Sequence, residues 1–375
     1  MLKKKLILIV SIAMISMCGT YTVNADGWDG SELPVYVNGS HAEVAGYYDG
    51  YVLHDDSIFE SHTDSYGWWP CESTKDGLTI KFDGGYYDFT NATIRIPDKI
   101  NKYIVTRIKG SCGFKKFDLN PENRYMECID NVLFSKDKKT LLSYAKFDER
   151  SEYVIPDGTE CIERGALAFC DNLMQISLPN SITVIEDTAM GGNSSLKTVY
   201  LSKNVKTIPD HCFFSSKELK TVNIPKNSKL NLIEESAFDS CESLNNLYLP
   251  SFEIEIDRSA FGYNYKKTHK THLKSYVQPK VSVSENKLSW EKIPNASYYE
   301  IYQKLNSGEY KLLKTTKATA CKFTTLKSGK SYTFAVKPVA VIPAANYDKE
   351  KDEGEYPESF TIEGTMSEDI VVIGK

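Results

Sequence analysis

The sequence predicts a mainly β fold, a solenoid of short parallel strands followed by a β-sandwich. Apolar residues return at fixed offsets, about every 23 residues, between positions 155 and 261. From position 277 onward, apolar and polar residues alternate in about seven short segments. A period of 20–50 residues is typical of solenoids, and about seven short strands in roughly 100 residues are typical of an immunoglobulin-like sandwich.

The repeat is defined by its apolar positions. Counted from an isoleucine origin, offsets of 5, 11, 14 and 16 residues each hold an apolar side chain. The origins are Ile162, Ile185, Ile208, Ile233 and Ile256, which are 23, 23, 25 and 23 residues apart. One unit has too few apolar side chains to form a core alone, so each should stack on its equivalent in the next coil. Alternation around offsets 14 and 16 predicts one short strand in each coil.

Two units, 162–179 and 233–244, carry the pattern most fully. They resemble leucine-rich repeats of the BspA-like (treponemal) type, which follow roughly IxxxAFxxCxxLxxVxIP, and the resemblance covers about 96–262. It implies a leucine-rich-repeat solenoid, expected here over 77–262. The usual phenylalanine at offset 5 is replaced by Leu167 and Met190 in the first two full units.

The segment 118–144 is similar to a hairpin insertion that is frequent in the same family. Locally, the apolar runs 132–134 and 141–142 flank a polar turn, which predicts a hairpin. Asn131 stands where the family has glycine, and both residues tolerate a positive φ. Upstream, 78–82 is expected to form a strand.

Residues 1–25 have the features of a secretory signal peptide, namely a basic start, a short apolar run over 6–17 and a small residue, Ala25, at the end. The apolar run is shorter than the roughly 20 residues that a transmembrane helix requires. Cleavage at Cys18 to give a lipoprotein is the alternative, although Met17 stands where that motif requires a small residue. Removal of 1–25 changes the net charge from -5 to -8 because three lysines leave. A negative chain argues against nucleic acid and anionic membranes as partners.

Residues 26–76 are rich in aromatic and acidic residues and show no sustained period. We expect them to cap the open start of the solenoid, because the first coil needs a cover. The alternative is that the tyrosines around 47–51 and the pair Trp68 and Trp69 stack on sugars or anchor a protein interface.

Residues 263–276 are basic and polar and are expected to be a linker. His269 and His272 have the spacing of metal ligands, but no Cys, Asp or Glu near them completes a site, so we expect them to be solvated.

Residues 277–375 resemble a fibronectin type III domain, which implies an immunoglobulin-like β-sandwich. Trp290 fits the strand that carries the buried tryptophan of that family. Tyr332 fits the corner where a tyrosine hydroxyl binds back to the backbone. The stretch 338–355 is expected to be a long charged loop between the last two strands.

We predict no catalytic, cofactor-binding or metal-binding residues. The GxSxG and HExxH motifs are absent from the sequence. Cys170 and Cys241 occupy equivalent positions three coils apart, roughly 14 Å, whereas a disulfide needs Cα atoms within about 7 Å. The cysteines are therefore interpreted mostly as small buried apolar residues. A pair of glycosidase carboxylates stays open, because such a pair follows no sequence spacing rule.

The residues that alternate with the inward strand positions should form one exposed face, which solenoids commonly use for ligands. The candidate ligand-binding residues are Gln175, Ser177, Thr198, Tyr200, Thr221, Asn223, Asn246 and Tyr248, with Glu152 and Val154 on the preceding coil. The alternative is an ordinary solvated β face.

Members of the resembled family are often surface or secreted adhesion proteins. The resemblance therefore implies a secreted or surface-associated, non-enzymatic binding protein whose partner is an extracellular protein or glycan. One alternative is an enzyme or carbohydrate-active protein that uses 26–76 and has the repeats as a targeting module. The other is a structural spacer of the cell envelope.

Overall fold

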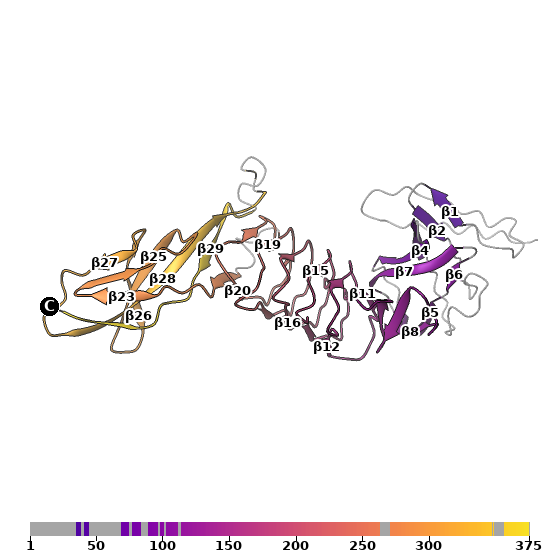
Figure 1. Ribbon diagram of the computed structural model, residues 1–375, viewed down its shortest axis with the longest axis horizontal. Coiled ribbons are helices and arrows are strands. Elements are labelled where there is room, and N and C mark those ends of the chain that lie inside the picture. The colour runs from indigo at the N-terminus through magenta and orange to yellow at the C-terminus, as the bar shows by residue number, and fades with distance from the viewer. Residues whose placement is uncertain are drawn as a thin grey trace, which may run out of the picture.

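The computed structural model of the protein has three parts in a row (Figure 1). It describes residues 35–38, 41–44, 69–74, 77–83, 89–96, 98–100, 103–111, 114–262, 271–346, 348 and 356–374. These described residues contain strands β1 to β30 and no helix. A group of N-terminal strands lies at one end, the coils lie in the middle, and a sandwich lies at the other end. The predicted fold class is confirmed, whereas the predicted signal peptide, 1–25, lies outside the described residues.

The N-terminal strands form a six-stranded sheet in the order β1-β2-β3-β4-β7-β6 and a parallel pair, β5 and β8. Their bounds are β1 (Val35–Asn38), β2 (His41–Val44), β3 (Trp69–Thr74), β4 (Gly77–Asp83), β5 (Phe89–Ile96), β6 (Lys99–Ile100), β7 (Tyr103–Ser111) and β8 (Phe114–Leu119). The three strands within 26–76 extend this sheet from the edge of β4. That 26–76 acts as a cap stays a prediction.

Each coil contributes one short strand to each of two opposite edges of the solenoid (Figure 1). One edge has β13 (Cys161–Ile162), β15 (Val184–Ile185), β17 (Thr207–Ile208), β19 (Leu232–Ile233) and β21 (Glu255–Ile256). The other has β12 (Glu152–Val154), β14 (Gln175–Ser177), β16 (Thr198–Tyr200), β18 (Thr221–Asn223) and β20 (Asn246–Leu249). The strands that the sequence predicts at offset 14 are those of the second edge, while the strands at the isoleucine origins were not predicted.

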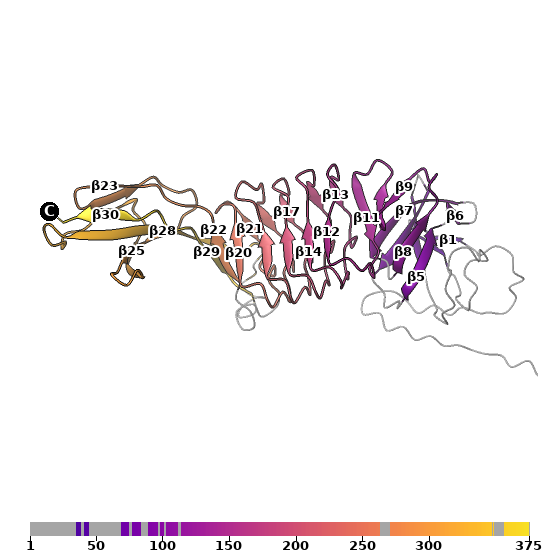
Figure 2. The ribbon, with the colours of Figure 1, turned by 90° about the horizontal axis from the view of Figure 1, so that it is seen from below.

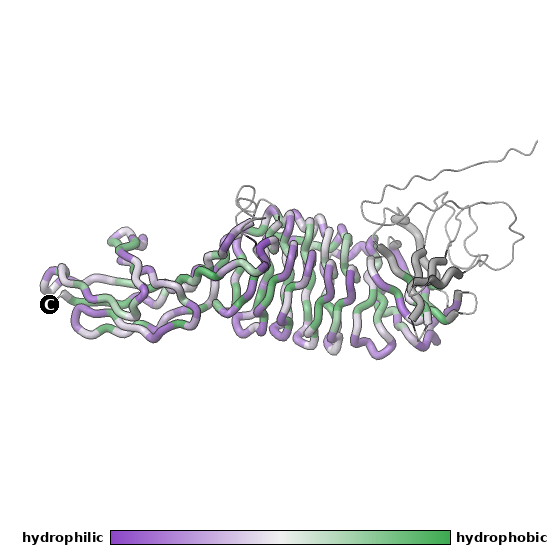
Figure 3. The backbone as a smooth tube through the Cα atoms, turned by 90° about the horizontal axis from the view of Figure 1, so that it is seen from above, coloured by the Kyte–Doolittle hydropathy of each residue, from purple (hydrophilic) through white to green (hydrophobic). Residues whose placement is uncertain are grey.

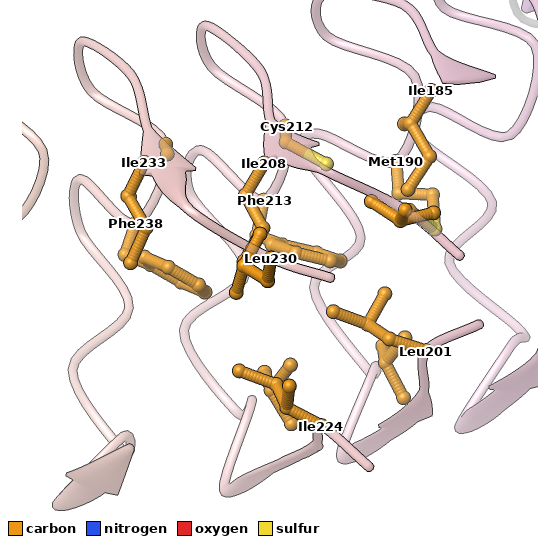
Figure 4. Packing of buried hydrophobic residues seen from close by; sticks show 14 of the residues in the cluster. Ile185, Met190, Leu201, Ile208, Cys212, Phe213, Ile224, Leu230, Ile233 and Phe238 are labelled. Carbon is orange, nitrogen blue, oxygen red and sulfur yellow. The ribbon is translucent and has the colours of Figure 1, made fainter. Parts of the chain in front are cut away.

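The apolar offsets line up from coil to coil. Ile162, Ile208, Ile233 and Ile256 have no exposed surface, and Ile185 is only 6% exposed. Figure 4 shows Ile185, Ile208 and Ile233 in a row, with Met190, Phe213 and Phe238 of offset 5 in a second row beside them. In that second row, the Phe213 and Phe238 rings stack with centroids 5.4 Å apart, and the Phe238 and Phe261 rings with centroids 5.5 Å apart. Full burial of each such side chain contributes about 1.5–3 kcal/mol, so the stability of a coil depends on its neighbours.

Hydropathy alternates along every coil because the chain repeatedly enters and leaves the core (Figure 3). The turn at offset 7 uses left-handed backbone: φ is 56° at Phe169, 72° at Gly192, 57° at Ser215 and 58° at Ser240. This conformation is unfavourable by about 1–2 kcal/mol of free energy for any residue other than glycine. At Gly192 only glycine fits, since a Cβ atom there would lie 2.4 Å from the Phe169 ring.

Offset 8 holds a buried residue whose chemistry changes from coil to coil. Cys170 and Cys241 are buried there as thiols, and Asn193 and Ser216 are buried as polar groups. Asn193 accepts a hydrogen bond from the Cys170 backbone N–H at 2.6 Å and donates two more to backbone carbonyls of 167 and 190, at 2.9 and 2.8 Å. The Ser216 hydroxyl, by contrast, has no hydrogen-bond partner among the described residues.

The predicted hairpin closes the N-terminal end of the coils. Its strands are β9 (Met126–Ile129), β10 (Val132–Ser135) and β11 (Thr140–Tyr144), and β11 pairs in parallel with β13. Asn131 has a φ of 64°, as its predicted place in a turn requires. Its side chain accepts from Phe117 N at 2.9 Å and donates to Asp148 Oδ2 at 2.9 Å, which connects β8, the hairpin and the following turn.

A buried carboxylate that pairs with two partly exposed cations joins the N-terminal sheet to the first coil. Glu163 has 1% of its side chain exposed and binds Arg107 and Lys109 of β7, the latter at 2.9 Å. A buried carboxylate without a partner would be strongly destabilising. The pair therefore fixes the position of β7 on the coil.

The far end of the apolar column is covered by the C-terminal part. The described end of the predicted linker is a strand, β22 (His272–Ser275), which pairs in parallel with β20 and with β29 (Ser359–Glu363). The stretch 338–343, expected to be part of a loop, is the end of the long strand β28 (Ser331–Pro343). Residues 339–343, all apolar, pair with β29, and the Phe360 ring lies 5.9 Å from that of Phe261 in the last coil.

The sandwich packs a three-stranded sheet, β23-β24-β27, on the sheet that contains β26, β25, β28 and β30. Their bounds are β23 (Val281–Ser284), β24 (Lys287–Trp290), β25 (Tyr298–Lys304), β26 (Tyr310–Thr316), β27 (Ala320–Lys322) and β30 (Ile370–Ile373). Trp290 is buried against Tyr299, with ring centroids 5.2 Å apart. Tyr332 Oη accepts a hydrogen bond from Lys327 N at 3.1 Å, which is the predicted bond back to the backbone.

The offset-8 position generates a matched pair of predictions. Ser216→Ala removes a buried hydroxyl that has no partner and should raise the free energy of unfolding by about 1 kcal/mol. Asn193→Ala leaves three backbone groups without partners and should lower it by about 2–3 kcal/mol. Urea titration followed by circular dichroism measures both values. A loss of stability in Ser216→Ala would contradict the absence of a partner.

The Asp148 site generates a pH prediction. Burial opposes ionisation of Asp148, but hydrogen bonds from Arg150 and Asn131 outweigh burial, so its pKa lies below the ordinary value. The carboxylate should therefore stabilise the fold above about pH 3.9, the ordinary value for aspartate, and this contribution should be lost as the pH falls through the lower folded pKa.

Asp148→Asn tests this behaviour. The difference in unfolding free energy between wild type and variant should be about 1–3 kcal/mol at pH 7, the value of hydrogen bonds to a charged group. It should shrink toward zero as the pH is lowered below 4. A difference that stays constant from pH 7 to pH 2.5 would show that the charge of Asp148 is not involved.

Candidate functional site: the polar strip of the solenoid

The candidate site is the outward face of one edge of the solenoid, which we call the polar strip. Its residues are Gln175, Ser177, Thr198, Tyr200, Thr221, Asn223, Asn246 and Tyr248. Parallel pairing places Gln175 beside Thr198, and Thr198 beside Thr221. Between each pair of outward residues, an inward residue such as Val199 is buried in the column. The buried residue holds its two outward neighbours at a fixed position.

A second row of the strip runs parallel to the first. It places Ser177 beside Tyr200, and Tyr200 beside Asn223. Tyr200 is 45% exposed, whereas Ser177 and Asn223 are half-buried. Neighbouring strands lie about 4.8 Å apart, so the strip offers hydroxyl and amide groups at regular intervals around one projecting ring.

The structure brings together six of the eight predicted residues in one hydrogen-bonded sheet, in the order β12-β14-β16-β18. Asn246 and Tyr248 lie on β20, which contacts β18 but pairs with β22 in another sheet. Both residues are exposed, as predicted. Glu152 and the 68% exposed Val154 lie on β12 at the opposite end of the strip.

The structure adds two residues to the strip that sequence reasoning missed. Tyr276 stacks on Tyr248 with ring centroids 5.6 Å apart and planes inclined by 28°. Lys274 Nζ lies over the Tyr248 ring, 5.6 Å from its centroid. Tyr276 Oη donates a hydrogen bond to the Ile224 carbonyl at 3.3 Å, which holds the Tyr276 ring against the preceding coil. The alternation over 272–275 is the signal that could have indicated a strand here.

The strip continues onto the sandwich through hydrogen-bonded strands (Figure 2). Lys274 of β22 is paired with Glu363 of β29, whose side chain binds Lys337 at 3.2 Å. Lys337 also binds Glu300 on β25 at 2.9 Å. From β20 onward, the backbone pairing therefore runs unbroken from the last coil into the sandwich.

Burial raises the pKa of five described thiols and makes them poor nucleophiles, namely Cys128, Cys161, Cys170, Cys212 and Cys241. Cys128, Cys161, Cys170, Cys212, Cys241 and Cys321 are free thiols. Burial raises the pKa of Cys161 to about 11 and that of Cys241 to about 12. Since the thiolate is the reactive form, these groups are protonated at neutral pH.

His211 is the described histidine with a carboxylate partner. Its Nδ1 lies 2.5 Å from Asp210 Oδ1, and its ring lies against Phe214. The hydrogen bonds of its side chain include no hydroxyl or thiol that it could activate. Within the part of the chain that the structure describes, no three His, Cys, Asp or Glu side chains gather to hold a metal ion. The same residues include no helix with the length and hydropathy of a membrane span.

Residues 142–268 match the family model described as the BspA type leucine rich repeat region, in six copies. The match covers about a third of the chain and includes the eight predicted residues of the polar strip but not Lys274 and Tyr276. None of the curated proteins compared with the chain matches it.

Solved structures of bacterial leucine-rich repeat proteins are similar to part of the chain. A leucine rich cell surface protein from Faecalibacterium prausnitzii is 24% identical, with a TM-score of 0.43, over 52% of this chain and 50% of that one. The pneumococcal vaccine antigen PcpA is 20% identical, with a TM-score of 0.38, over 49% of this chain and 51% of that one. A leucine-rich repeat protein from Eubacterium ventriosum is 21% identical, with a TM-score of 0.32, over 45% of this chain and 58% of that one. This chain spans about half the length of the first two structures.

Proposed function

We propose that this chain is a secreted or surface-associated, non-enzymatic binding protein that recognises an extracellular protein or glycan through the polar strip. The observation that carries the proposal is the pair of exposed tyrosines, Tyr200 and Tyr248, on a face whose strands are held in register by a buried column. The match of residues 142–268 to a leucine-rich repeat family supports a binding role in general.

Rigidity of the strip supports recognition. The strands that carry it pair residue by residue, and their inward side chains, such as Ile176 and Val199, are fully buried. A ligand that binds such a face does not have to order it first. Preorganisation of this kind raises affinity because it lowers the entropy lost on binding.

The tyrosines supply the contact area. Tyr200 and Tyr248 expose 45% and 40% of their surface, and the Tyr248 ring is held in place by Tyr276 and Lys274. A tyrosine offers a flat apolar ring and a hydroxyl at low entropy cost, and tyrosines are enriched among the residues that dominate binding energies. The neighbouring threonine and asparagine side chains add hydrogen-bonding groups.

The other parts of the chain have supporting roles in this proposal. The sandwich, with buried Trp290 and the Tyr332 hydrogen bond, is proposed to be of the fibronectin type III kind and to act as a spacer or second contact. The limits 77–262 for the solenoid and 277–375 for the sandwich stay predictions. So do secretion through residues 1–25 and the cap formed by 26–76.

The strip predicts the effect of removing its two rings. Tyr200→Ala combined with Tyr248→Ala should weaken binding by about 2 kcal/mol or more, roughly 30-fold, because both exposed anchors are lost. An array of glycans and matrix proteins, probed with the purified chain, identifies the ligand, and titration calorimetry then compares wild type and variant.

A matched control removes two tyrosines of similar exposure elsewhere. Tyr125 and Tyr310 are 37% and 38% exposed and lie outside the strip. Tyr125→Ala combined with Tyr310→Ala should bind the ligand as wild type does. Equal binding by the Tyr200 and Tyr248 variant would reject the strip as the binding site.

A further inference from the structure

Charge is distributed along the coils in three blocks. Residues 152–196 contain seven acids and one arginine, and residues 230–262 contain the same numbers, so each block has a net charge of -6. Between them, residues 197–229 contain seven lysines and two acids, Asp210 and Glu218, for a net charge of +5. The middle coils are therefore basic in a chain whose net charge is -5.

The lysines of the middle block lie at the surface, and no described residue pairs with their charge. Six are exposed, namely Lys197, Lys206, Lys217, Lys220, Lys226 and Lys229, and Lys203 is half-buried. None of the seven forms an ion pair with a described residue. Like charges that gather without counter-charges repel one another and create a positive potential that attracts anions.

Several of these lysines border the polar strip at both ends of its central strands, whereas Lys206 directly precedes β17 on the opposite edge of the solenoid. Lys197 directly precedes β16 and Lys220 directly precedes β18, and their backbones are hydrogen-bonded at 3.0 Å. Beyond the other end of β16, Lys203 accepts a hydrogen bond from Lys229 N at 2.8 Å, so these residues also belong to adjacent coils. Tyr200, on β16, lies between the two groups in the chain.

We infer that the polar strip binds a short linear oligosaccharide that carries negative charges, an acidic glycan rather than a neutral one. The inference rests on the proposed function, because it names the class of ligand for the same face. The lysines at either end of β16 and β18 attract the charged groups, Tyr200 stacks on a sugar ring, and Thr198, Thr221 and Asn223 bind sugar hydroxyls.

The composition of the face favours an oligosaccharide over a protein. Lysine is depleted in the cores of protein interfaces, where arginine and apolar residues are enriched. The middle block has seven lysines and no arginine, and the strip residues around Tyr200 are small and polar. Ammonium groups on flexible stems attract an anion as point charges, without the fixed two-pronged geometry of arginine.

The acidic blocks on either side weigh against nucleic acid and anionic membranes. A long polymer with one charge on every nucleotide would extend from the basic coils onto blocks of net charge -6 and would be repelled there. A flat bilayer would meet the same acidic neighbours. A short acidic oligosaccharide fits within the middle coils, where Lys197, Lys203, Lys220 and Lys226 surround the strip.

The test compares oligosaccharides of equal length with the purified chain. Polygalacturonate oligosaccharides, which are acidic, should bind at least tenfold more tightly than neutral maltooligosaccharides in calorimetry at low salt. Raising the salt concentration from about 0.05 to 0.5 M should lower the affinity for the acidic oligosaccharide by about tenfold or more, because the Debye length falls and the charges are screened. A variant with Lys197, Lys203, Lys220 and Lys226 each changed to Gln should lose this binding by a similar factor.

The matched control changes four exposed sandwich lysines, Lys287, Lys311, Lys314 and Lys322, to Gln, and it should bind as wild type does. Thermal unfolding should show that both variants are folded. Equal affinity for neutral and acidic oligosaccharides, no binding of polygalacturonate, or unchanged binding by the strip-lysine variant would each overturn the inference. Tighter binding of polyglutamate, single-stranded DNA or anionic vesicles would overturn it in favour of that partner.

The two proposals fail in different ways. If Tyr200→Ala with Tyr248→Ala abolishes binding of an array ligand while the strip-lysine variant binds it normally, the strip is a binding site but its ligand is not acidic. If neither variant changes binding of any array ligand, the strip itself is rejected.

Discussion

Each coil of this protein buries its apolar side chains against the next coil, and the rest of the structure depends on that contact. Ile208 and Phe213 have no exposed surface, yet their partners along the column come from the units before and after them. A single coil has no hydrophobic core of its own, so its stability comes from the contacts that it makes with the coils on either side. Because the inward residues cannot shift by one position without exposing an apolar side chain, the outward residues are fixed as well.

A column of this kind has two open ends, and both are covered by specific contacts. At the start, Glu163 is buried between Arg107 and Lys109 of β7, while Asn131 connects the hairpin to β8 and Asp148. At the other end, the backbone of 256–258 in the last coil is hydrogen-bonded to Ala345, and the Phe360 ring packs near Phe261. The sandwich is therefore joined to the solenoid through paired backbone and shared core.

The same constraint explains why a binding face is available. Acidic and basic blocks alternate along the surface, but the same apolar positions recur in the column beneath every block, so the surface charge is free to vary without loss of the fold. Tyr200 and the lysines of the middle coils contribute little to the core. Tyr248 is different, because stacking on Tyr276 connects it to the strand that leads into the sandwich.

By itself the sequence determined the period, the inward residues and the outward strip, because stacking of identical offsets is a local rule that recurs in every coil. It also indicated the hairpin around Asn131 and the burial of Trp290, since turn chemistry and strand alternation are local. Only the tertiary structure showed that β22 and the end of β28 cover the last coil, and that Lys274 and Tyr276 extend the strip. These pairings join residues far apart in the chain, such as Leu273 with Ile362, and no local pattern specifies which distant strand a given strand will meet.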